Sequence, residues 1–431
     1  MRTRRASMDV LWNGAAVSTK LTQYRLSATY TDPASGEGDS LELSMQNAGE
    51  EWSNAWMPQK GDTLSASIVL TDWDGPGDNR TLACGSFTLD SFSFSGFPNT
   101  VTVQALSTPA DGGFAGTKRD KIWEQITVQA IGREIANRAG IAFVWDVSAA
   151  PLVLATVEQK SQTDAAFYQT LCEDYGYCLK VYANKLVVYD REEKKRLPSA
   201  AVIPREAVLR YDWETTLTGT YTGGQYTYTD PVTEENVTAT VGGGARLLVE
   251  SGQAASQADA QWKLTAAIAQ ANHGATKANL SIPGNAALAA SQCIDLVGLG
   301  KLSGKYYIDS ITHNIGSGYT MDLELSLVST MTETVLHDAI DRLGRIGVMD
   351  SPGYWKEHVH DLLYLDSLIL NLSAIIRQNQ DGSSVITVGQ AITILTAKGA
   401  INSPDYWRAN ATALQWLDAL LIKAANALTP D

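Results

Sequence analysis

The sequence predicts a mainly β protein of the α+β class: two tube-like antiparallel β-barrels with an α/β insert, followed by an all-α C-terminal repeat domain. Alternating apolar and polar residues run through 8–108 and again through 208–329, interrupted by Gly, Pro and Asp, which is typical of half-buried antiparallel strands. A helical pattern separates these regions, and a second, internally repeated helical pattern follows them. We therefore expect domains at residues 1–117, 118–197, 198–330 and 331–431.

The first β region shows the two-residue period most clearly. Between residues 63 and 70 every second side chain is apolar, and the segment 72–79 that follows is rich in turn-forming Gly, Asp and Pro. The same period continues at Phe87, Leu89, Phe92, Phe94, Val101, Val103 and Ala105. Reactive side chains are few here, which is more typical of a sheet that meets partner proteins than of a catalytic one.

The α/β insert is predicted from two helical patterns. Four isoleucines at helical spacing predict a helix over 121–139, ended by Gly140: Ile122, Ile126, Ile131 and Ile135. The segment from Ser161 to Asp164 has the form of a capping box, and the helix after it should bury Phe167, Leu171 and Tyr175. A hairpin with strands at 179–182 and 186–189 should follow.

The second β region is predicted to contain one inserted helix. Strand patterns cover 208–248 and 276–329. Between them, the Ala-rich segment 254–272 has helical spacing and ends before Gly274, with these residues facing inward: Ala258, Leu264, Ile268 and Ala271. We expect this helix to be an insertion between two parts of the second barrel.

Residues 331–431 contain an internal repeat. A Ser-Pro-x-Tyr-Trp segment that begins at Ser351 returns 52 positions later at Ser403. A capping Ser followed by Pro is the start signal of a helix, so two αα-hairpins are predicted, at 334–376 and 386–427. The corner residues are Ser351, Pro352, Tyr354, Trp355, Ser403, Pro404, Tyr406 and Trp407. Their Tyr-Trp pairs could stack on sugars, but equal placement in both repeats favours core packing.

Composition excludes several classes of protein. A net charge of −14 argues against sequence-specific nucleic-acid binding, which needs clustered Lys and Arg. No run of 18 apolar residues predicts a transmembrane span. The basic start lacks the apolar stretch of an export signal, and the sequence leaves open whether Met1 or Met8 begins translation. The four cysteines lie in segments predicted to be buried, so we expect free thiols.

We predict no catalytic residues, no cofactor and no metal site. The segment after Asp72 resembles the start of a calcium loop, but Ala83 stands where such a loop needs Glu, so a turn is the better interpretation. His358 and His360 are two positions apart on a helix and cannot share a metal. Acidic pairs such as Asp212 and Glu214 could serve a glycosidase in principle, but solvated surface acids explain them as well.

One long stretch of the chain carries a family resemblance. Its motifs run in unbroken order over about residues 8–330: Tyr30-Thr-Asp32, Gly38-Asp-Ser-Leu-Glu42, Trp52…Trp56-Met-Pro58, Gly61-Asp62, Cys84-Gly-Ser-Phe-Thr-Leu-Asp90, Lys180-Val181, Gly304-Lys-Tyr306, His313 and Gly318-Tyr319. This order resembles the phage late-control gene D family, baseplate hub proteins of contractile tails. The C-terminal repeat is similar to a helical module of Firmicute phage tail proteins and wall hydrolases.

The resemblance implies a structural role without catalysis. It implies a homotrimer with a pseudo-sixfold ring that adapts the sixfold tail tube to the threefold spike, assembled in the bacterial host cytoplasm. Implied partners are the tail tube, spike and baseplate wedge proteins, and the tape-measure protein is a further candidate. The family-patterned positions are Trp52, Trp56, Pro58, Gly61, Asp62, Gly85, Phe87, Asp90, Gly304, Tyr306 and His313. The alternative, suggested by the terminal repeat, is a peptidoglycan-binding or peptidoglycan-hydrolysing tail protein.

Overall fold

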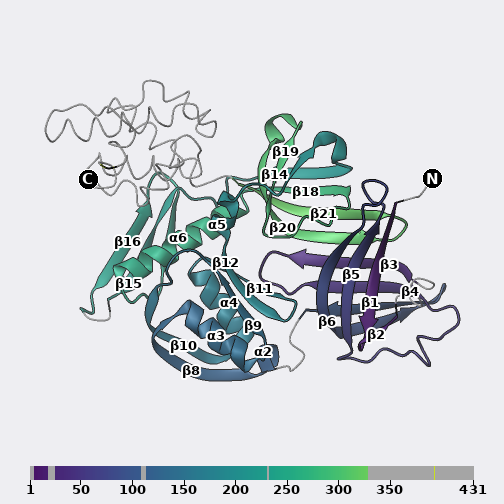
Figure 1. The fold of residues 1–431 in the computed structure, drawn as a ribbon. Coiled ribbons are helices and arrows are strands. Elements are labelled where there is room, and N and C mark those ends of the chain that lie inside the picture. Colours follow the sequence, from purple (N-terminus) through teal and green to yellow (C-terminus); the bar gives the residue numbers. More distant parts are fainter. Residues whose placement is uncertain (1–3, 18–24, 108–112, 231–232, 329–392, 394–431) are drawn as a thin grey trace. The chain divides into compact units, whose positions relative to one another are not determined.

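The computed structural model describes residues 4–17, 25–107, 113–230, 233–328 and 393 of the chain. Strands dominate the described residues, and thirteen of them form one sheet (Figure 1). Most neighbours in this sheet pair in the antiparallel direction. The prediction of a mainly β protein with antiparallel sheets is therefore confirmed.

Seven strands of the first β region form one half of the sheet. They are β1 (Arg5–Trp12), β2 (Ala15–Ala16), β3 (Arg25–Pro33), β4 (Ser40–Gln46), β5 (Thr63–Thr71), β6 (Arg80–Ser95) and β7 (Thr100–Leu106). Their order is β3-β4-β7-β6-β5-β1-β2. Alternate side chains of β5 and β7 are buried, as predicted, because one face of these strands covers the core.

Six strands of the second β region form the other half. They are β13 (Ala201–Pro204), β14 (Arg210–Thr215), β18 (Thr276–Pro283), β19 (Cys293–Val297), β20 (Gly304–Ile315) and β21 (Tyr319–Leu327). The order is β14-β18-β21-β20, and β19 with β13 beyond it attaches to the start of β20. Two short 3-10 helices, η1 (Arg205–Ala207) and η2 (Gly300–Leu302), lie in the connections β13–β14 and β19–β20.

The two halves are joined directly, which corrects the expectation of two barrels connected through the α/β insert. β20 pairs with β21 on one edge, and on the other edge with β19 at residues 304–307 and with β3 at residues 310–315. His313 of β20 thereby lies opposite Tyr30 of β3. Alternation identifies the faces of a strand and not its neighbours, so the sequence could not predict this pairing.

A single apolar core lies along both halves of this sheet. It contains Leu41 and Val103 from the first half and Leu280 and Leu323 from the second, each at most 3% exposed. Because these side chains form one continuous cluster, the two halves stabilise each other.

The α/β unit has its own core, separate from that of the sheet. It comprises α2 (Gly113–Gly116), β8 (Lys118–Thr127), α3 (Val128–Arg138), β9 (Ala142–Asp146), β10 (Val153–Thr163), α4 (Asp164–Asp174), β11 (Tyr177–Tyr182), β12 (Lys185–Asp190) and α5 (Arg191–Arg196). β8 pairs with β10, and β11, β12 and β9 form a three-stranded sheet. The predicted hairpin is confirmed as β11–β12, with Ala183 and Asn184 at positive φ in its turn.

Two local predictions in the α/β unit were wrong. Residues 118–127 are strand β8, and α3 begins only at Val128. A spacing of four, as between Ile122 and Ile126, puts side chains on one face of a strand as well as of a helix. The cap of α4 is Thr163, whose hydroxyl accepts the Ala166 N–H, and not Ser161.

The insertion in the second β region is larger than the single helix expected. A three-stranded sheet of β15 (Gly223–Thr229), β16 (Asn236–Gly242) and β17 (Leu247–Ser251) precedes α6 (Gln257–His273). Leu264 and Ile268 of α6 are buried as predicted, whereas Ala258 is exposed. Residues 216–275 thus form a module of their own, inserted between β14 and β18, instead of barrel strands interrupted by a helix.

The predicted C-terminal hairpins with their Ser351 and Ser403 corners, together with His358 and His360, lie outside the described residues. Within the part of the chain that the structure does describe, every helix is too short or too polar to cross a lipid bilayer.

Candidate functional site: the polar interface between the α/β unit and the sheet

Five of the family-patterned residues build one corner of the first half-sheet. Trp52 is buried, with its ring centroid 5.9 Å from that of Trp12 and 5.5 Å from that of Trp56. Asp62 accepts hydrogen bonds from Trp12 Nε1 at 2.9 Å and from Asn13 Nδ2 at 2.8 Å. Burial raises the pKa of Asp62, but these bonds and that from the Gln59 N–H leave it below its usual value.

Pro58 and Gly61 complete this corner. Pro58 is buried, and Gly61 has a φ of +92°, a conformation that favours glycine. The Gly61 N–H donates to the Leu89 carbonyl, and the Leu89 N–H donates to the Asp62 carbonyl. The corner therefore ties the approach to β5 to strand β6, and its role is structural.

A second set of family-patterned residues meets at the junction of the halves. His313 is 1% exposed and stacks on Tyr30 at 5.4 Å and on Tyr319 at 5.9 Å. Its Nδ1 lies 2.8 Å from the Tyr319 hydroxyl, and Phe87 packs edge-on against Tyr30. Burial lowers the pKa of His313 to about 4, although the Asp32 carboxylate opposes this shift. His313 is therefore a neutral core residue at neutral pH.

The remaining family-patterned residues lie apart from one another. Gly85 follows a bulge in β6 at a φ of +102°, and Asp90 is exposed at a second bulge. Gly304 begins β20. The buried Tyr306 accepts from Trp213 Nε1 at 3.1 Å and donates to the Leu302 carbonyl at 2.7 Å. The structure does not bring these residues together in one site.

One cluster of buried charge involves residues that sequence reasoning did not single out for a site. Lys180 of β11 reaches between two carboxylates: its Nζ bonds Asp32 Oδ1 and lies 3.3 Å from Asp39 Oδ1. The exposed fractions of the three side chains are 14% for Lys180, 9% for Asp32 and 0% for Asp39. Tyr30 donates to Asp39 Oδ2 at 2.6 Å, and the Ala290 N–H donates to Asp32 Oδ2 at 2.9 Å.

Further hydrogen bonds surround this cluster, and all of them join the β11–β12 hairpin to the sheet. The Gly36 N–H donates to the Leu179 carbonyl at 3.1 Å. The Tyr189 hydroxyl donates to the Ala34 carbonyl at 2.7 Å and lies 3.0 Å from that of Tyr307. Tyr182 donates to the Ala83 carbonyl at 3.0 Å. These contacts form a polar interface between two apolar cores.

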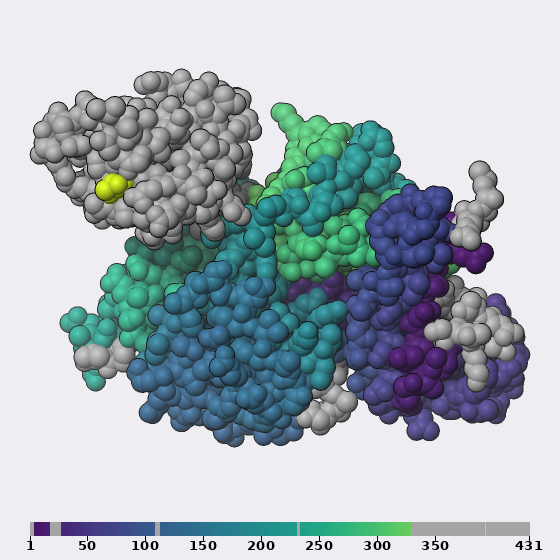
Figure 2. All heavy atoms as spheres, in the orientation of Figure 1, coloured from purple at the N-terminus to yellow at the C-terminus, as the bar shows by residue number. Residues whose placement is uncertain are grey.

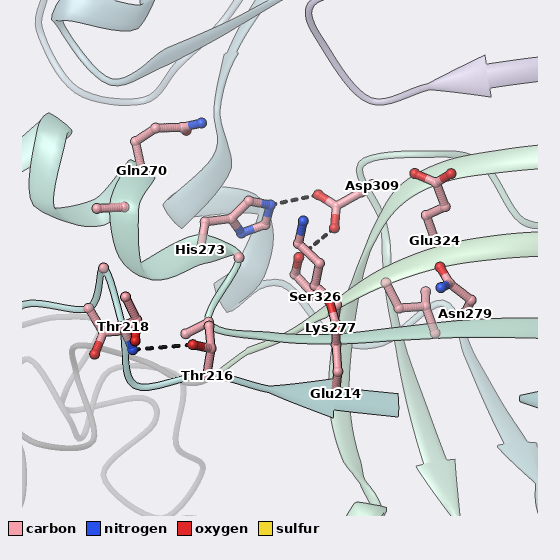
Figure 3. Close-up of a pocket in the computed structure, with 16 residues that line it drawn as sticks. Glu214, Thr216, Thr218, Gln270, His273, Lys277, Asn279, Asp309, Glu324 and Ser326 are labelled. Atoms are coloured by element: carbon pink, nitrogen blue, oxygen red, sulfur yellow. Dashed lines mark hydrogen bonds and ion pairs between the residues drawn. The ribbon is translucent and has the colours of Figure 1, made fainter. Parts of the chain in front are cut away.

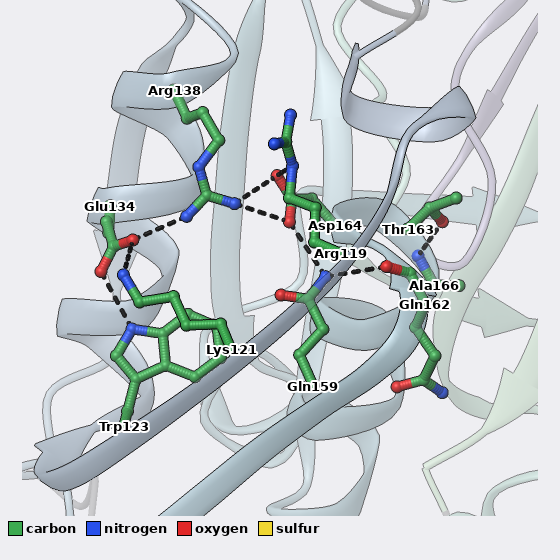
Figure 4. Close-up of polar contacts among 10 residues, drawn as sticks. All are labelled: Arg119, Lys121, Trp123, Glu134, Arg138, Gln159, Gln162, Thr163, Asp164 and Ala166. Atoms are coloured by element: carbon green, nitrogen blue, oxygen red, sulfur yellow. Dashed lines mark hydrogen bonds and ion pairs between the residues drawn. The ribbon is translucent and has the colours of Figure 1, made fainter.

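A second charged network holds the α/β unit together internally (Figure 4). Arg138 donates to both oxygens of the buried Asp164, at 2.9 and 2.8 Å, and to Glu134 at 2.6 Å. Arg119 and Gln159 also contact Asp164. Burial raises the pKa of Glu134, but hydrogen bonds from Lys121, Trp123 Nε1 and Arg138 leave it lowered overall. The network joins the paired strands β8 and β10 to α3 and α4.

A polar cavity of about 690 Å³ opens where the end of α6 meets β14, β18 and β21 (Figure 3). His273 Nε2 lies 2.6 Å from Asp309 Oδ1, and Ser326 donates to Asp309 Oδ2 at 2.6 Å. Asp309 thus stands between Ser326 and His273. A nucleophilic serine needs the histidine as its direct neighbour, so this order of residues does not activate Ser326.

The segment after Asp72 is a turn, as expected. The Gly77 N–H donates to Asp72 at 2.6 Å, and Arg80 pairs with both Asp74 and Asp78. Its carboxylates are therefore occupied within the turn. Across the described residues, no group of three or more His, Cys, Asp or Glu side chains is placed to hold a metal ion.

Two curated phage proteins match part of the chain. The "Probable baseplate hub protein" of Escherichia phage P2 is 26% identical over 197 residues, which are 46% of this chain and 48% of the relative. That of Escherichia phage 186 is 24% identical over 200 residues, or 46% and 49%. The curated homologues of this chain are thus phage baseplate hub proteins. The resemblance seen in the sequence is confirmed, although the chain spans about half the length of the curated hub proteins it matches.

A solved structure shows the same fold. The tail protein of Neisseria meningitidis MC58 superposes with a TM-score of 0.57 at 11% sequence identity, covering 75% of this chain and 97% of that protein. Figure 2 shows this chain alone, with all its heavy atoms as spheres. No protein-family model matches the chain. Likeness to the hub proteins thus comes from sequence, and likeness to the Neisseria tail protein comes from the fold.

Proposed function

We propose that this protein is a structural baseplate hub of a contractile phage tail or of a related injection particle, without catalytic activity. The names of the curated homologues and the tail-protein fold support this role. So does the chemistry of the described residues, whose buried charges join structural elements and do not surround a reacting centre.

We further propose a trimer that forms a pseudo-sixfold ring. The observation that carries this proposal is the division of one sheet into two halves, β1–β7 and β13–β21, fused at β20. If each half acts as one ring module, three copies supply six modules. Such a ring would meet the sixfold tail tube on one side and the threefold spike on the other.

One edge of the sheet is suited to meet a neighbouring copy. Within the described strands β14 pairs only with β18, so its other edge is open. Trp213 packs against the core, yet Tyr211, two positions earlier on the same face, is 45% exposed, and Leu209 is 61% exposed. Leu217, just beyond the strand, is 70% exposed. Apolar side chains along an open edge favour pairing with another chain.

The remaining features of the proposal follow from the hub role. The partners are the tail tube protein, the spike, the wedge proteins and the tape-measure protein. The particle is assembled in the host cytoplasm and the protein resides in the baseplate. Residues 331–431 would bind another tail component.

Two measurements test this proposal against the alternative of a wall-binding or wall-degrading tail protein. Size-exclusion chromatography with light scattering should show that the purified 46.4 kDa chain is a trimer. Mixed with its tube and spike proteins, the trimer should co-elute with both. Electron microscopy of that complex should show six similar modules around a channel. A monomer that binds neither protein and clears peptidoglycan in a gel assay would overturn the proposal.

A further inference from the structure

We propose that Asp32, Asp39 and Lys180, together called the latch, form a proton-operated device at the interface of the α/β unit and the sheet. With a proton on Asp39 the latch holds the α/β unit against the sheet, and loss of that proton lets the unit undock. The inference does not depend on the proposed ring or on any partner.

The geometry makes Lys180 the charged link between two parts of the chain. It projects from β11 of the α/β unit, whereas Asp32 lies on β3 of the sheet and Asp39 lies just before β4. Asp32 also accepts the Ala290 N–H, from the segment between β18 and β19. One ammonium group therefore connects β11 to the β3–β4 connection and, through Asp32, to the second half of the sheet.

The balance of charge in the latch depends on one proton. When Asp39 is protonated, Lys180 and Asp32 form a neutral ion pair. When both carboxyls are ionised, a net negative charge remains at a site where Asp39 is 0% exposed. A buried charge without its own partner costs considerable free energy, so the ionised latch is the weaker one. Undocking would return that charge to water.

Asp39 is the group of this site that titrates near neutral pH. Burial, aided by the charge of Asp32, raises the pKa of Asp39 to about 7, even though Lys180 and the hydrogen bond from Tyr30 oppose the shift. The groups facing the latch from the elements around it are Tyr30 and Asp32 on β3, Lys180 and Tyr182 on β11, Cys84 on β6 and His313 on β20.

Most of these neighbours keep one protonation state between about pH 6 and about pH 8. Burial raises the pKa of Tyr30 far above its usual value, raises that of Tyr182 and raises that of Cys84 to about 12. Burial lowers the pKa of His313 to about 4. The pKa of Lys180 is raised, because Asp32 and Asp39 outweigh the effect of its burial.

The interface that the latch closes is suited to opening. The sheet and the α/β unit keep separate apolar cores, so undocking breaks neither. Two hydrogen bonds join the β11–β12 hairpin to the connection that follows β3. The Gly36 N–H donates to the Leu179 carbonyl, and the Tyr189 hydroxyl donates to the Ala34 carbonyl. Movement of Lys180 away from Asp32 and Asp39 therefore weakens neighbouring contacts at the same place.

Hydrogen–deuterium exchange of the full chain tests the latch, with rates corrected for the intrinsic effect of pH. Asp39 binds a proton more tightly in the docked state than in the undocked state, so docking weakens as pH rises towards and through about 7. Protection of the Gly36 N–H, whose acceptor is the Leu179 carbonyl across the interface, should fall about tenfold between about pH 6 and about pH 8, as a docked pKa of about 7 and an undocked value of about 4 require. Peptides from β4, β5 and β7 serve as the internal reference.

Three variants complete the experiment. Asp39→Asn mimics the protonated carboxyl, and protection of the Gly36 N–H should then be the same at both pH values. Lys180→Met should lose protection there at both. Asp90→Asn, at an exposed carboxyl of β6, should behave as wild type. Equal protection of the wild type at both pH values overturns the proposal whether or not the variants fold, and so does an undiminished tenfold change in Asp39→Asn.

Discussion

The hydroxyls of Thr215 and Thr276 lie 2.8 Å apart at the last paired position of the β14–β18 hairpin. The Thr216 N–H donates to the Ala275 carbonyl one position further along, also at 2.8 Å. The module of β15–β17 and α6 therefore leaves the sheet and returns to it at neighbouring residues. Such a module adds to a hairpin without altering the register of either strand.

We expect the sheet to fold when residues 216–275 are replaced by a short turn between Thr215 and Thr276. The cost should fall on the α/β unit, because Tyr175 loses its hydrogen bond to Asp259 and its carbonyl loses the Trp262 indole. Hydrogen exchange should show wild-type protection in β3–β7, and calorimetry a lower midpoint of thermal unfolding. Loss of protection throughout β3–β7 would contradict this independence.

Tyr211→Asp should prevent self-association while leaving the monomer folded. The side chain is 45% exposed on the open edge strand, so a charge costs little in the monomer and more where two edges pair. Light scattering gives the mass, and circular dichroism tests the fold. Val249→Asp, at a residue of β17 that is 71% exposed, is the matched control and should retain the oligomer. The idea fails if Tyr211→Asp assembles like wild type.

Asp164→Ala should lower the free energy of unfolding of the α/β unit by about 2–4 kcal/mol, because the buried carboxylate accepts hydrogen bonds from Arg138 and Gln159 and forms an ion pair with Arg119. Hydrogen exchange of α3 and α4 at increasing urea concentrations measures the loss. Glu158→Gln breaks an ion pair with Lys160 at the surface and should cost less than about 0.5 kcal/mol. Equal effects in the two variants would show that the Asp164 network adds little.

His313 should make stability fall as the solution becomes acidic. Its pKa of about 4 in the folded protein is below the unfolded value of about 6.5, so the unfolded chain binds the extra proton first. Stability from this group is complete above about pH 6.5 and should fall by about 2 kcal/mol between about pH 7 and about pH 5. The Asp39 contribution has the opposite sign in that range, because its folded pKa is raised.

Urea unfolding of wild type and His313→Gln at those two pH values isolates the histidine. On going to the lower pH, the free energy of unfolding of wild type should fall more than that of the variant. A difference that stays constant across the range would mean that folding does not lower the pKa of His313.

Local patterns predicted local structure well where only one period fitted. The alternation of 63–70 placed Leu64, Ala66, Ile68 and Leu70 in the core, and all four are buried. The helical prediction was wrong at 121–127, because the spacing of Ile122 and Ile126 fits a strand as well as a helix, and Ile122 is 60% exposed on β8.

The candidate interface could not be predicted in the same way. Lys180 and Asp32 are 148 residues apart in sequence, and nothing local indicates that one side chain neutralises the other. The family motifs include both residues, but a sequence match does not indicate that their side chains are in contact. Their contact depends on the pairing of β3 with β20 and on the docking of β11, which are long-range features.

The four thiols of this chain give it a practical property. All four are free and buried, and burial raises the pKa of each, to about 12 for Cys84 and about 11 for Cys293. Maleimide and similar reagents react with exposed thiolates, so the four natural cysteines of the native protein should react little with them. A single cysteine placed on its surface could therefore carry a fluorophore or spin label without prior removal of the natural ones.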